Sequence, residues 1–522
     1  MLEKNQTYQV NIESYGCNGE GIARIDGIPV FIENALKGET VEILIVKVLK
    51  NFAYGKLLRV LEASPHRKEP ICPVFKRCGG CQMLHMAYDE QLRLKTDIVK
   101  DCMRKFSGLK DFSVADAVGM NENPYHYRNK AQYPVEGNRL GFYAPRSHDL
   151  IAIDACPVQN EKDARLIRII EKYPYAGEIR HLYTRTGKDE FMAVLVTRSE
   201  KLRDKDYFIR EMKEAGVTTL VQNINPENTN VILGKTNITL YGEGKITGEI
   251  LGLKFVISPH SFFQINTVQT EKLYTKAKEL LDLKGNEVLM DLYCGIGSIG
   301  LTMADKVKKL IGVECVPQAI ENAIENAKAN GVENAEFIVG LSEEIFPRLL
   351  ARDIRPDAVI IDPPRKGCDE ALLNTLNTYL PEKIVYISCN PSTLARDLKI
   401  LSENYKIGTV YPYDLFPHTK HVETCVLLSK LKSSKSVSIE LDLDDLEITA
   451  AEAKATYGEI KGYILNKYGF KVSSLNIAQV KQECGIIERE NYNKPSGKYR
   501  QPKCPEHKFN AIKEALEHFK MI

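Results

Sequence analysis

The sequence lacks several features that would define a class of protein at once. Its 522 residues carry 71 Lys and Arg against 69 Asp and Glu, so no charge excess indicates a polyanionic partner. No uncharged apolar run approaches the roughly 18 residues of a membrane span, and the first residues hold no apolar signal segment. We therefore expect a cytoplasmic protein of several domains with no membrane contact.

Residues 1–60 consist mainly of short alternating strands separated by glycine turns. The expected strands lie at 8–12, 21–25, 28–32, 40–46 and 53–60. About five short strands with this spacing predict a small barrel of the OB type. The segment also resembles a TRAM domain, an RNA-binding barrel, through Gly16, the Gly-Glu-Gly at 19–21 and the Leu36-Lys-Gly-Glu loop. A β-domain without a role in RNA binding is the open alternative.

Cysteine spacing is informative because thirteen cysteines are an odd number for a disulfide framework. Cys72, Cys78 and Cys81 follow a C-x5-C-x2-C spacing, and Cys156 offers a distant fourth thiolate. Four thiolates suit either a tetrahedral zinc ion or an iron–sulfur cluster. Spacing alone does not decide between these two groups.

A helical period marks residues 89–106, and residues 112–258 follow with strands and short helices. From 261 to 430 apolar strands alternate with helical segments, which predicts a mostly parallel, doubly wound sheet. The expected strands are 287–293, 309–314, 358–362, 383–388 and 424–428. In such a sheet, ligand chemistry lies at the carboxyl ends of the strands.

A serine-rich and acidic stretch at 433–447 is typical of a linker, and residues 450–522 then predict a helical extension. A loop at 491–503 mixes basic residues with tyrosines and has no acidic residue, a composition suited to phosphate attraction and base stacking. The residues are Lys494, Lys498, Arg500, Lys503, Tyr492 and Tyr499. An ordinary solvated loop is the alternative, and the role of the extension stays open.

A glycine-rich turn follows the first strand of the doubly wound pattern. Asp291-Leu-Tyr-Cys-Gly-Ile-Gly ends that strand and opens a helix, and Glu314 ends the next strand. The glycines permit a tight turn close to a ligand, and the acidic residue can accept hydrogen bonds from two ribose hydroxyls. A dinucleotide site is the competing interpretation. Asp291 at the strand end and the D-x-Y-C-G-x-G form favour S-adenosylmethionine.

Three further residues lie at strand ends of the same region. Asp362 stands in Asp-Pro-Pro-Arg, whereas the Asn-Pro-Pro-aromatic form that favours methylation of exocyclic amines is absent. Cys389 stands in Ser-Cys-Asn-Pro, where a thiolate can act as nucleophile, although a half-buried structural cysteine is the commoner fate. Glu423 opens the last strand in His-Val-Glu-Thr and is the candidate base.

A methyl donor, a cysteine and a carboxylate at one sheet edge suit methylation of carbon 5 of uracil. That carbon is a poor nucleophile until a thiolate adds to carbon 6 and generates an enolate. Carbon 5 then attacks the sulfonium methyl group, and a base removes its proton before the thiol is eliminated. We therefore assign the nucleophile to Cys389 and the base to Glu423.

With these motifs in order, the sequence resembles the RNA 5-methyluridine (uracil-5-) methyltransferase family, and most closely its 23S ribosomal RNA branch. The match spans residues 1–430. It implies that Cys389 is the nucleophile and that Glu423 is the proton acceptor. The cofactor contacts that it implies are Gln264, Tyr293, Glu314 and Asp362. Position 298 is Ser where some members have Asn, so this contact stays open.

The same resemblance implies a [4Fe-4S] cluster held by Cys72, Cys78, Cys81 and Cys156, with zinc as the lesser alternative. Radical chemistry on S-adenosylmethionine needs a C-x3-C-x2-C spacing with one iron left open, so the spacing here favours a closed, structural cluster. Such a cluster would hold the loop that presents RNA.

Residues 125–133 mix basic and aromatic side chains, a composition suited to a single-stranded RNA surface. An ordinary polar strand edge is the alternative. The target uracil must leave the base stack to reach Cys389, so we expect base flipping into a cleft between the central and catalytic domains.

We therefore predict a multidomain α/β RNA methyltransferase. Its predicted parts are 1–60, a TRAM-like β-barrel; 61–260, a central mixed α+β RNA-binding domain with the four-cysteine cluster; 261–430, a Rossmann-like S-adenosylmethionine-dependent methyltransferase domain; and 450–522, a helical C-terminal extension. Helix 89–106 is expected to pack with the catalytic domain.

The predicted reaction is carbon-5 methylation of a uridine in 23S ribosomal RNA. The same chemistry on tRNA and a noncatalytic ribosome-assembly factor are the alternatives. The sequence does not identify the uridine, the number of sites, the protein partners, a redox role for the cluster or the oligomeric state.

Overall fold

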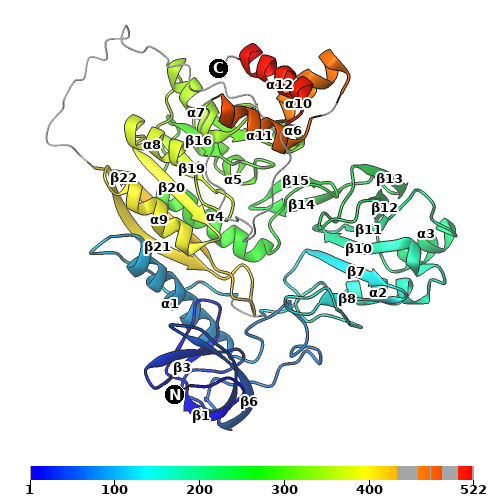
Figure 1. Cartoon of the computed structure of the whole chain (residues 1–522), viewed down its shortest axis with the longest axis vertical. Helices are drawn as coiled ribbons and strands as arrows, with labels where there is room; N and C mark the ends of the chain where they lie inside the picture. The colour runs from blue at the N-terminus through cyan, green and yellow to red at the C-terminus, as the bar shows by residue number, and fades with distance from the viewer. Residues whose placement is uncertain (1, 121–122, 432–456, 471, 485–503, 520–522) are drawn as a thin grey trace. The chain divides into compact units, whose positions relative to one another are not determined.

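The computed structural model describes residues 2–120, 123–431, 457–470, 472–484 and 504–519 (Figure 1). The chain forms two compact units, Met1–Lys432 and Ser433–Ile522. The linker at 433–447 and the basic loop at 491–503 lie outside the described residues. Within the described ranges, no helix has both the length and the apolar character needed to cross a membrane.

The first unit begins with a six-stranded sheet in the order β1-β5-β6-β4-β3-β2. Its strands are β1 (Thr7–Asn11), β2 (Ser14–Tyr15), β3 (Gly21–Ile25), β4 (Ile28–Ile32), β5 (Thr40–Val48) and β6 (Ala53–Glu62). Alternation places Val41, Ile43 and Ile45 of β5 in the core, because successive side chains point to opposite faces. The five predicted strands are all present, and the two-residue β2 is an additional one.

Helix α1 (Tyr88–Phe106) lies in the predicted range and packs against α9 (Pro391–Leu401). Leu94, Ile98 and Val99 on its apolar face join a core cluster shared with the doubly wound sheet described below. Leu36, in the loop between β4 and β5, joins the same cluster, so α1 connects the two parts of this unit.

A second sheet of seven strands, the central sheet, is formed by the middle of the chain, in the order β13-β12-β11-β10-β7-β8-β9. Its strands are β7 (Lys130–Glu136), β8 (Arg139–Tyr143), β9 (Leu150–Ala152), β10 (Ile179–Thr186), β11 (Phe191–Thr197), β12 (Thr219–Ile224) and β13 (Thr236–Tyr241). One face carries α2 (Asp163–Lys172) and α3 (Lys205–Glu214) over a core with Tyr133 and Leu182. The other face, with Tyr183, shares a core with the hairpin of β14 (Ile246–Ile250) and β15 (Leu253–Ile257).

The doubly wound sheet has seven strands in the order β18-β17-β16-β19-β20-β22-β21. Its strands are β16 (Val288–Leu292), β17 (Lys309–Glu314), β18 (Ala335–Val339), β19 (Ala358–Ile361), β20 (Lys383–Ser388), β21 (Tyr405–Tyr413) and β22 (Glu423–Lys430). Its helices, besides α9, are α4 (Thr267–Leu281), α5 (Ser298–Leu301), α6 (Pro317–Ala329), α7 (Ser342–Ala351) and α8 (Glu370–Tyr379).

The strands from β18 to β20 run parallel, and β22 pairs antiparallel with both β20 and β21. The mostly parallel sheet predicted from the sequence is therefore present. Chain order reverses between β16 and β19, and in open α/β sheets a ligand crevice lies at such a reversal, outside the carboxyl ends of the strands.

The second unit contains three helices within its described residues, α10 (Tyr457–Tyr468), α11 (Ser474–Glu483) and α12 (Glu506–His518). A capping box between Ser473 and Asn476 begins α11. Ile464, Ile477 and Ile512, one from each helix, are fully buried in a core of their own. The predicted helical extension is therefore present and builds a separate core.

Candidate active site

The turn after β16 has a backbone shape suited to close contact with a ligand. Gly295 and Gly297 have φ angles of 56° and 79°, in the left-handed region that glycine tolerates best. Tyr293 has a φ angle of 69°, which is uncommon for a residue other than glycine. Residues held in such conformations are often found at functional sites. Burial raises the pKa of the Tyr293 hydroxyl, so this side chain packs into the turn as a neutral group.

Asp291 lies in β16 and is 1% exposed. Its Oδ2 accepts a hydrogen bond from the Gly300 backbone N–H at 2.9 Å, whereas Oδ1 is buried with no partner among the described residues. A Cβ on Gly300 would lie 2.9 Å from the same carboxylate, so glycine is needed for this close contact. Burial raises the pKa of Asp291 to about 8, and the charges of Asp362 and Glu314 add to this effect. The unpartnered oxygen suits a donor group of a bound cofactor.

Glu314 ends β17, the neighbouring strand, where the sequence places it. Its carboxylate oxygens accept hydrogen bonds from the backbone N–H groups of Gly295 at 3.2 Å and Val316 at 2.9 Å. These bonds hold the partly exposed carboxylate beside the glycine turn. It is therefore placed to accept hydrogen bonds from the ribose hydroxyls of a nucleoside cofactor.

Gln264 lies in the segment that enters α4. Its backbone carbonyl accepts a hydrogen bond from Asn129 Nδ2 at 2.8 Å, which ties it to the central sheet. Burial and the charge of Asp362 raise the pKa of the Tyr274 hydroxyl, whereas hydrogen bonds with the Ser298 and Gln264 side chains oppose that rise. Gln264 therefore lies near the carboxyl ends of β16 and β19, together with Asp362.

The structure brings Cys389 and Glu423 together. Strands β20 and β22 pair antiparallel with Ser388 opposite Thr424, so the next pair in this register is Cys389 and Glu423. Cys389 is partly exposed, whereas Glu423 is 7% exposed. An accessible thiol therefore lies across from a buried carboxylate, at the sheet edge where Asp362 follows β19.

Burial and mutual repulsion set the protonation states at this edge. Burial raises the pKa of Glu423 to about 8, with the charge of Asp362 adding to it, and burial raises the pKa of Asp362 to about 7. Burial and the charges of Glu423 and Asp362 raise the pKa of the Cys389 thiol to about 11. At neutral pH the free protein therefore holds a neutral thiol beside a largely protonated Glu423. A cation bound beside Asp362 would shift both groups toward their ionised forms.

Three charged or titratable residues of the site escaped the sequence analysis. The charge of Arg365, within the Asp-Pro-Pro-Arg motif, lowers the pKa values of both Cys389 and Glu423. Burial, with Arg365 adding to it, lowers the pKa of His421 to about 4, so its imidazole is neutral. Lys95 of α1 is fully buried and also lowers the pKa of Glu423. The motif position was a usable signal for Arg365, but helical periodicity gave none for a buried lysine.

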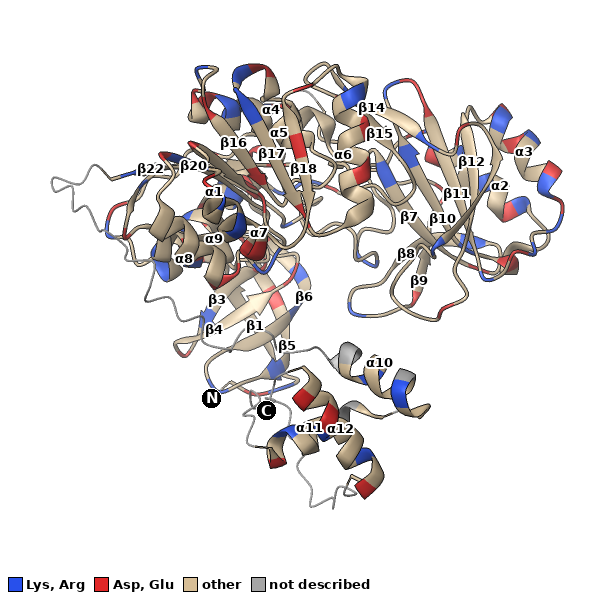
Figure 2. Cartoon of the chain, turned by 90° about the horizontal axis from the view of Figure 1, so that it is seen from above, with Lys and Arg blue, Asp and Glu red and all other residues tan. Residues whose placement is uncertain are grey.

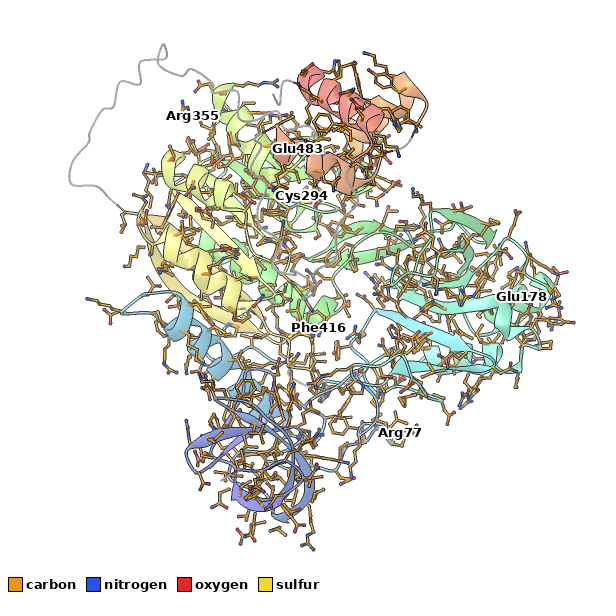
Figure 3. All side chains as sticks on the ribbon, viewed as in Figure 1. Arg77, Glu178, Cys294, Arg355, Phe416 and Glu483 are labelled. Carbon is orange, nitrogen blue, oxygen red and sulfur yellow. The ribbon has the colours of Figure 1, made fainter. Side chains whose placement is uncertain are left out.

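The segment before β22 is held by hydrogen bonds to four successive backbone carbonyls. The donors are Asn266 Nδ2 to Leu415 at 3.2 Å, Lys95 Nζ to Phe416 at 3.1 Å, the Tyr127 hydroxyl to Pro417 at 3.1 Å, and the Gln82 and Met83 N–H groups to His418 at 3.0 Å each. Figure 3 shows Phe416 where the doubly wound sheet approaches the central sheet. Because the donors come from separate parts of the chain, Glu423 follows a rigidly held segment.

The four predicted metal-binding cysteines line one cavity of about 210 Å³. Burial raises the pKa of Cys81, and the charges of Cys156, Cys78 and Cys72 add to it, so the four thiols lie near one another. The Gly80 backbone N–H donates to Cys78 Sγ at 3.4 Å, a contact that stabilises cluster sulfurs. Across the described residues, no group of three or more His, Cys, Asp or Glu side chains is arranged to hold a metal ion. The donor chemistry fits a thiolate-bound metal, whereas the side chains are not drawn together as ligands.

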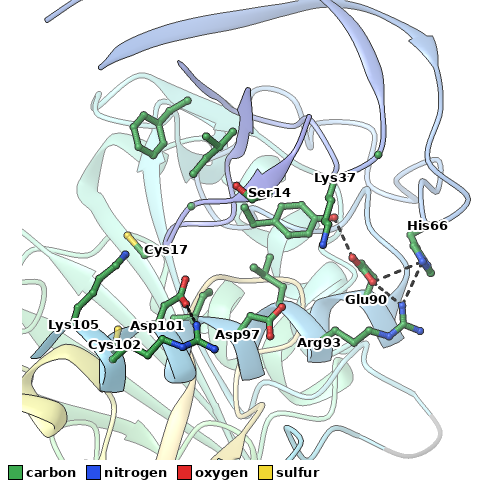
Figure 4. A pocket seen from close by; sticks show the side chains of 18 of the residues that line it. Ser14, Cys17, Lys37, His66, Glu90, Arg93, Asp97, Asp101, Cys102 and Lys105 are labelled. Carbon is green, nitrogen blue, oxygen red and sulfur yellow. Dashed lines mark hydrogen bonds and ion pairs between the residues drawn. The ribbon is translucent and has the colours of Figure 1, made fainter. Parts of the chain in front are cut away.

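A larger cavity, of about 940 Å³, lies between the N-terminal sheet and α1 (Figure 4). Its lining carries both charge signs, with Glu90 hydrogen-bonded to Arg93 at 2.7 Å and Asp101 to Arg104 at 2.6 Å. Neither Cys389 nor Glu423 lines it. The chemistry of the candidate site therefore lies elsewhere, at the edge of the doubly wound sheet.

Comparison with known proteins agrees with this geometry. The family described as tRNA (Uracil-5-)-methyltransferase matches residues 87–431, and the TRAM domain matches residues 2–58. An "uncharacterized RNA methyltransferase" of Clostridium tetani is 46% identical over 449 residues, covering 82% of this chain and 97% of the relative. One from Bacillus cereus (strain ATCC 10987) is 45% identical over 452 residues, covering 83% and 98%.

A solved structure with the same architecture is the Pyrococcus abyssi tRNA (uracil-54, C5)-methyltransferase in complex with S-adenosyl-L-homocysteine. It is 26% identical, with a TM-score of 0.65, and the match covers 80% of this chain and 99% of that one. The fold, the cofactor turn and these relatives define an S-adenosylmethionine-dependent RNA methyltransferase. The chain belongs to the tRNA (uracil-5-)-methyltransferase family.

Proposed function

We propose that this protein methylates carbon 5 of a uridine in 23S ribosomal RNA, with Cys389 as covalent nucleophile and Glu423 as base. The observation that carries the proposal is the register of β20 and β22, which sets these two side chains opposite each other. S-adenosylmethionine supplies the methyl group as a sulfonium, whose positive charge suits a site with buried carboxylates. The residues that would hold it are Gln264, Tyr293, Asp291, Glu314 and Asp362.

The proposed reaction begins when the Cys389 thiolate adds to carbon 6 of uracil. The new C–S bond places an electron pair on carbon 5 and the carbon-4 oxygen. Carbon 5 then forms a bond to the methyl group, and the electrons of the broken S–CH3 bond leave with the thioether product. Glu423, as the carboxylate, removes the proton from carbon 5, after which the C–S bond at carbon 6 breaks and returns the thiolate. Arg365 favours the ionised forms of both Cys389 and Glu423.

The protonation states of Cys389 and Glu423 in the free protein link formation of the thiolate to binding of S-adenosylmethionine. The pKa values of about 11 for Cys389 and about 8 for Glu423 hold both groups mostly neutral in the free protein. Each rise includes repulsion from Asp362, which a sulfonium beside that carboxylate would offset. The thiolate would then form mainly once the methyl donor is in place.

We also propose that Cys72, Cys78, Cys81 and Cys156 hold a [4Fe-4S] cluster, with zinc as the lesser alternative. Their common cavity supports this assignment, as does the Gly80 N–H directed at Cys78. A cluster here would be structural, because Gln82 and Met83, directly after Cys81, donate to the His418 carbonyl. Anaerobic purification followed by iron, sulfide and zinc analysis tests this assignment, with about four irons per chain expected.

Ribosomal RNA is the first candidate substrate because the chain combines a TRAM domain with the four-cysteine set. Residues 61–260 are assigned to RNA binding, with the helical extension at 450–522 as an addition of open role. Transfer RNA is the second candidate, because the Pyrococcus abyssi relative is named for uracil-54 of tRNA.

The decisive experiment is methyl transfer from labelled S-adenosylmethionine to unmodified 23S ribosomal RNA and tRNA transcripts, followed by nucleoside analysis. We expect 5-methyluridine in the 23S transcript alone. Label on tRNA alone would retain the mechanism and overturn the substrate. No label on either RNA, with both bound, would support an assembly factor instead.

The mechanism is tested with Cys389→Ala, which is expected to abolish turnover and leave RNA binding nearly intact. A matched control is Cys484→Ser, which removes a cysteine from the separate core of the second unit. Normal methylation by Cys389→Ala would show that the covalent mechanism is wrong.

A further inference from the structure

Three basic side chains gather where β7 begins and β10 ends. Lys130 of β7 lies directly opposite Arg185 of β10 in the antiparallel register, and Arg128 lies two residues before Lys130. Figure 2 shows basic positions, in blue, on the strands around β7 and β10. Like charges directly opposed across two strands repel each other, so this arrangement is unfavourable unless an anion offsets it.

Among the described residues, no carboxylate forms an ion pair with any of these three side chains, although Arg128 lines the cavity of the four cysteines. Arg185 is 2% exposed and donates through Nε to the Tyr183 hydroxyl at 2.8 Å and through Nη2 to the Ser261 carbonyl. Its Nη1 is buried without a partner, as is Nε of Arg128. A buried N–H group without an acceptor is costly, so these two unmet donors indicate a missing acceptor.

Lys130 shows the same imbalance. Burial, together with the charges of Arg185 and Arg128, lowers its pKa to about 8, and no acidic side chain among the described residues opposes this shift. The Tyr183 ring offers partial compensation, with Lys130 Nζ at 5.6 Å and the Arg185 guanidinium at 5.7 Å from its centroid. A cation–π contact at this distance contributes only a fraction of what a paired anion would.

The location connects this cluster to the candidate active site. Arg185 holds the carbonyl of Ser261, three residues before Gln264, and Asn129 holds the carbonyl of Gln264 itself. Arg128 lines two cavities, the one of about 210 Å³ that holds the four cysteines and another of about 330 Å³. The second is also lined by Asn129 from the central region, by Phe263 and Thr267 from the segment that enters α4, and by the carboxylates of Glu249 and Glu271. Lys130 and Arg185 line neither cavity. The cluster therefore lies where the central sheet approaches the doubly wound sheet, close to the predicted cofactor contact Gln264.

We propose that Arg128, Lys130 and Arg185 form a binding site for one backbone phosphate of the substrate RNA, next to the nucleotide that is methylated. Lys130 and Arg128, both partly exposed, donate to the phosphate oxygens, and the buried Arg185 adds charge from behind. This site rests on the proposed function, since it places the RNA strand that delivers uracil to Cys389. The carboxylate of S-adenosylmethionine is the other anion that these three cations could bind. The test below distinguishes it from an RNA phosphate.

The test uses the full-length protein and a short single-stranded RNA that contains the target uridine, with binding followed by fluorescence anisotropy. Lys130→Met is expected to weaken binding about tenfold, as for a charged hydrogen bond. The slope of log affinity against log salt is expected to fall by about 0.7, the value for one phosphate on a single strand. Lys213→Met, which removes the same charge from α3 on the opposite face of the central sheet, is the matched control and is expected to bind as wild type.

Neutral methylphosphonate, placed at one phosphate at a time, locates the contact. The wild type is expected to lose affinity at one position beside the target uridine, and Lys130→Met is expected to be insensitive at that position. An equal loss in both proteins at every position would overturn the proposal. Weaker binding of S-adenosylmethionine by Lys130→Met, with RNA binding unchanged, would assign the site to the cofactor carboxylate and also overturn it. Because these readouts measure binding, they stand even where methyl transfer to 23S RNA fails.

Discussion

Replacing Lys95 with methionine is expected to loosen the segment before Glu423, the carboxylate that we propose as the base. Lys95 and Asp414 are both fully buried, and their ion pair joins α1 to the segment between β21 and β22. Lys95 Nζ also donates to the Phe416 carbonyl at 3.1 Å. Methionine has a similar length and volume, so the substitution removes charge and hydrogen bonds while leaving little cavity.

The expected cost is about 3–5 kcal/mol, because loss of one partner of a buried ion pair leaves the other charge uncompensated. Adding Asp414→Asn removes the stranded charge, so the double variant is expected to regain most of the loss. Lys95→Met alone is also expected to lower the turnover number, since Glu423 follows the loosened segment.

Hydrogen exchange of the amides in residues 414–423 is the suitable assay, because it reports local opening in a chain whose parts need not unfold together. Lys95→Met is expected to raise exchange in this segment far more than in α2, which serves as the internal reference. Wild-type exchange in Lys95→Met would refute the reasoning. So would a double variant that opens as readily as the single one, because the uncompensated charge of Asp414 would not then be the cause.

Three further predictions concern the reaction. Glu423→Gln is expected to transfer the methyl group but to stall with RNA attached to Cys389, because no base then removes the carbon-5 proton. Denaturing gels of labelled RNA detect this covalent adduct. Absence of the adduct would contradict the role assigned to Glu423. The wild-type kcat/KM is expected to rise between about pH 6 and 9. The pKa values of Glu423, about 8, and Cys389, about 11, are both raised, so the ionised fraction of each group increases with pH in this range. A profile that falls over this range would contradict the assignment. Gly300→Ala would set a Cβ 2.9 Å from the Asp291 carboxylate, so calorimetry is expected to show at least about tenfold weaker cofactor binding with RNA affinity unchanged.

Strand prediction succeeded where burial leaves a simple pattern in the sequence. Strands β19 and β20 are buried on both faces and show as nearly continuous apolar runs between turn motifs. Strand β18 was missed because it is an edge strand with several partly exposed residues, so neither a run nor an alternation is visible. Strand β21 was missed because Gly408 and Pro412 interrupt it and its register shifts between Ile407 and Val410.

For the candidate site too, local motifs were predictable and contacts between distant segments were not. Cys389 and Glu423 could be named from short motifs, because each motif lies at a strand end and its chemistry is legible locally. Their opposed position depends on β22 entering antiparallel beside β20, which no local pattern states. Lys95 could not be named at all, because a lysine within a helical period predicts a solvated side chain rather than a buried ion pair.

The sequence by itself determined the family, the order of its parts and the residue types available for methyl transfer, because those are written in contiguous motifs and in hydrophobic periodicity. Only the tertiary structure decided which charges meet. The raised pKa values at Glu423 and Cys389, the Lys95–Asp414 pair and the opposed cations Lys130 and Arg185 all arise between segments distant in the chain. Electrostatic energies depend on separation and on burial, and both are set by how the sheets and helices pack rather than by neighbours in the sequence.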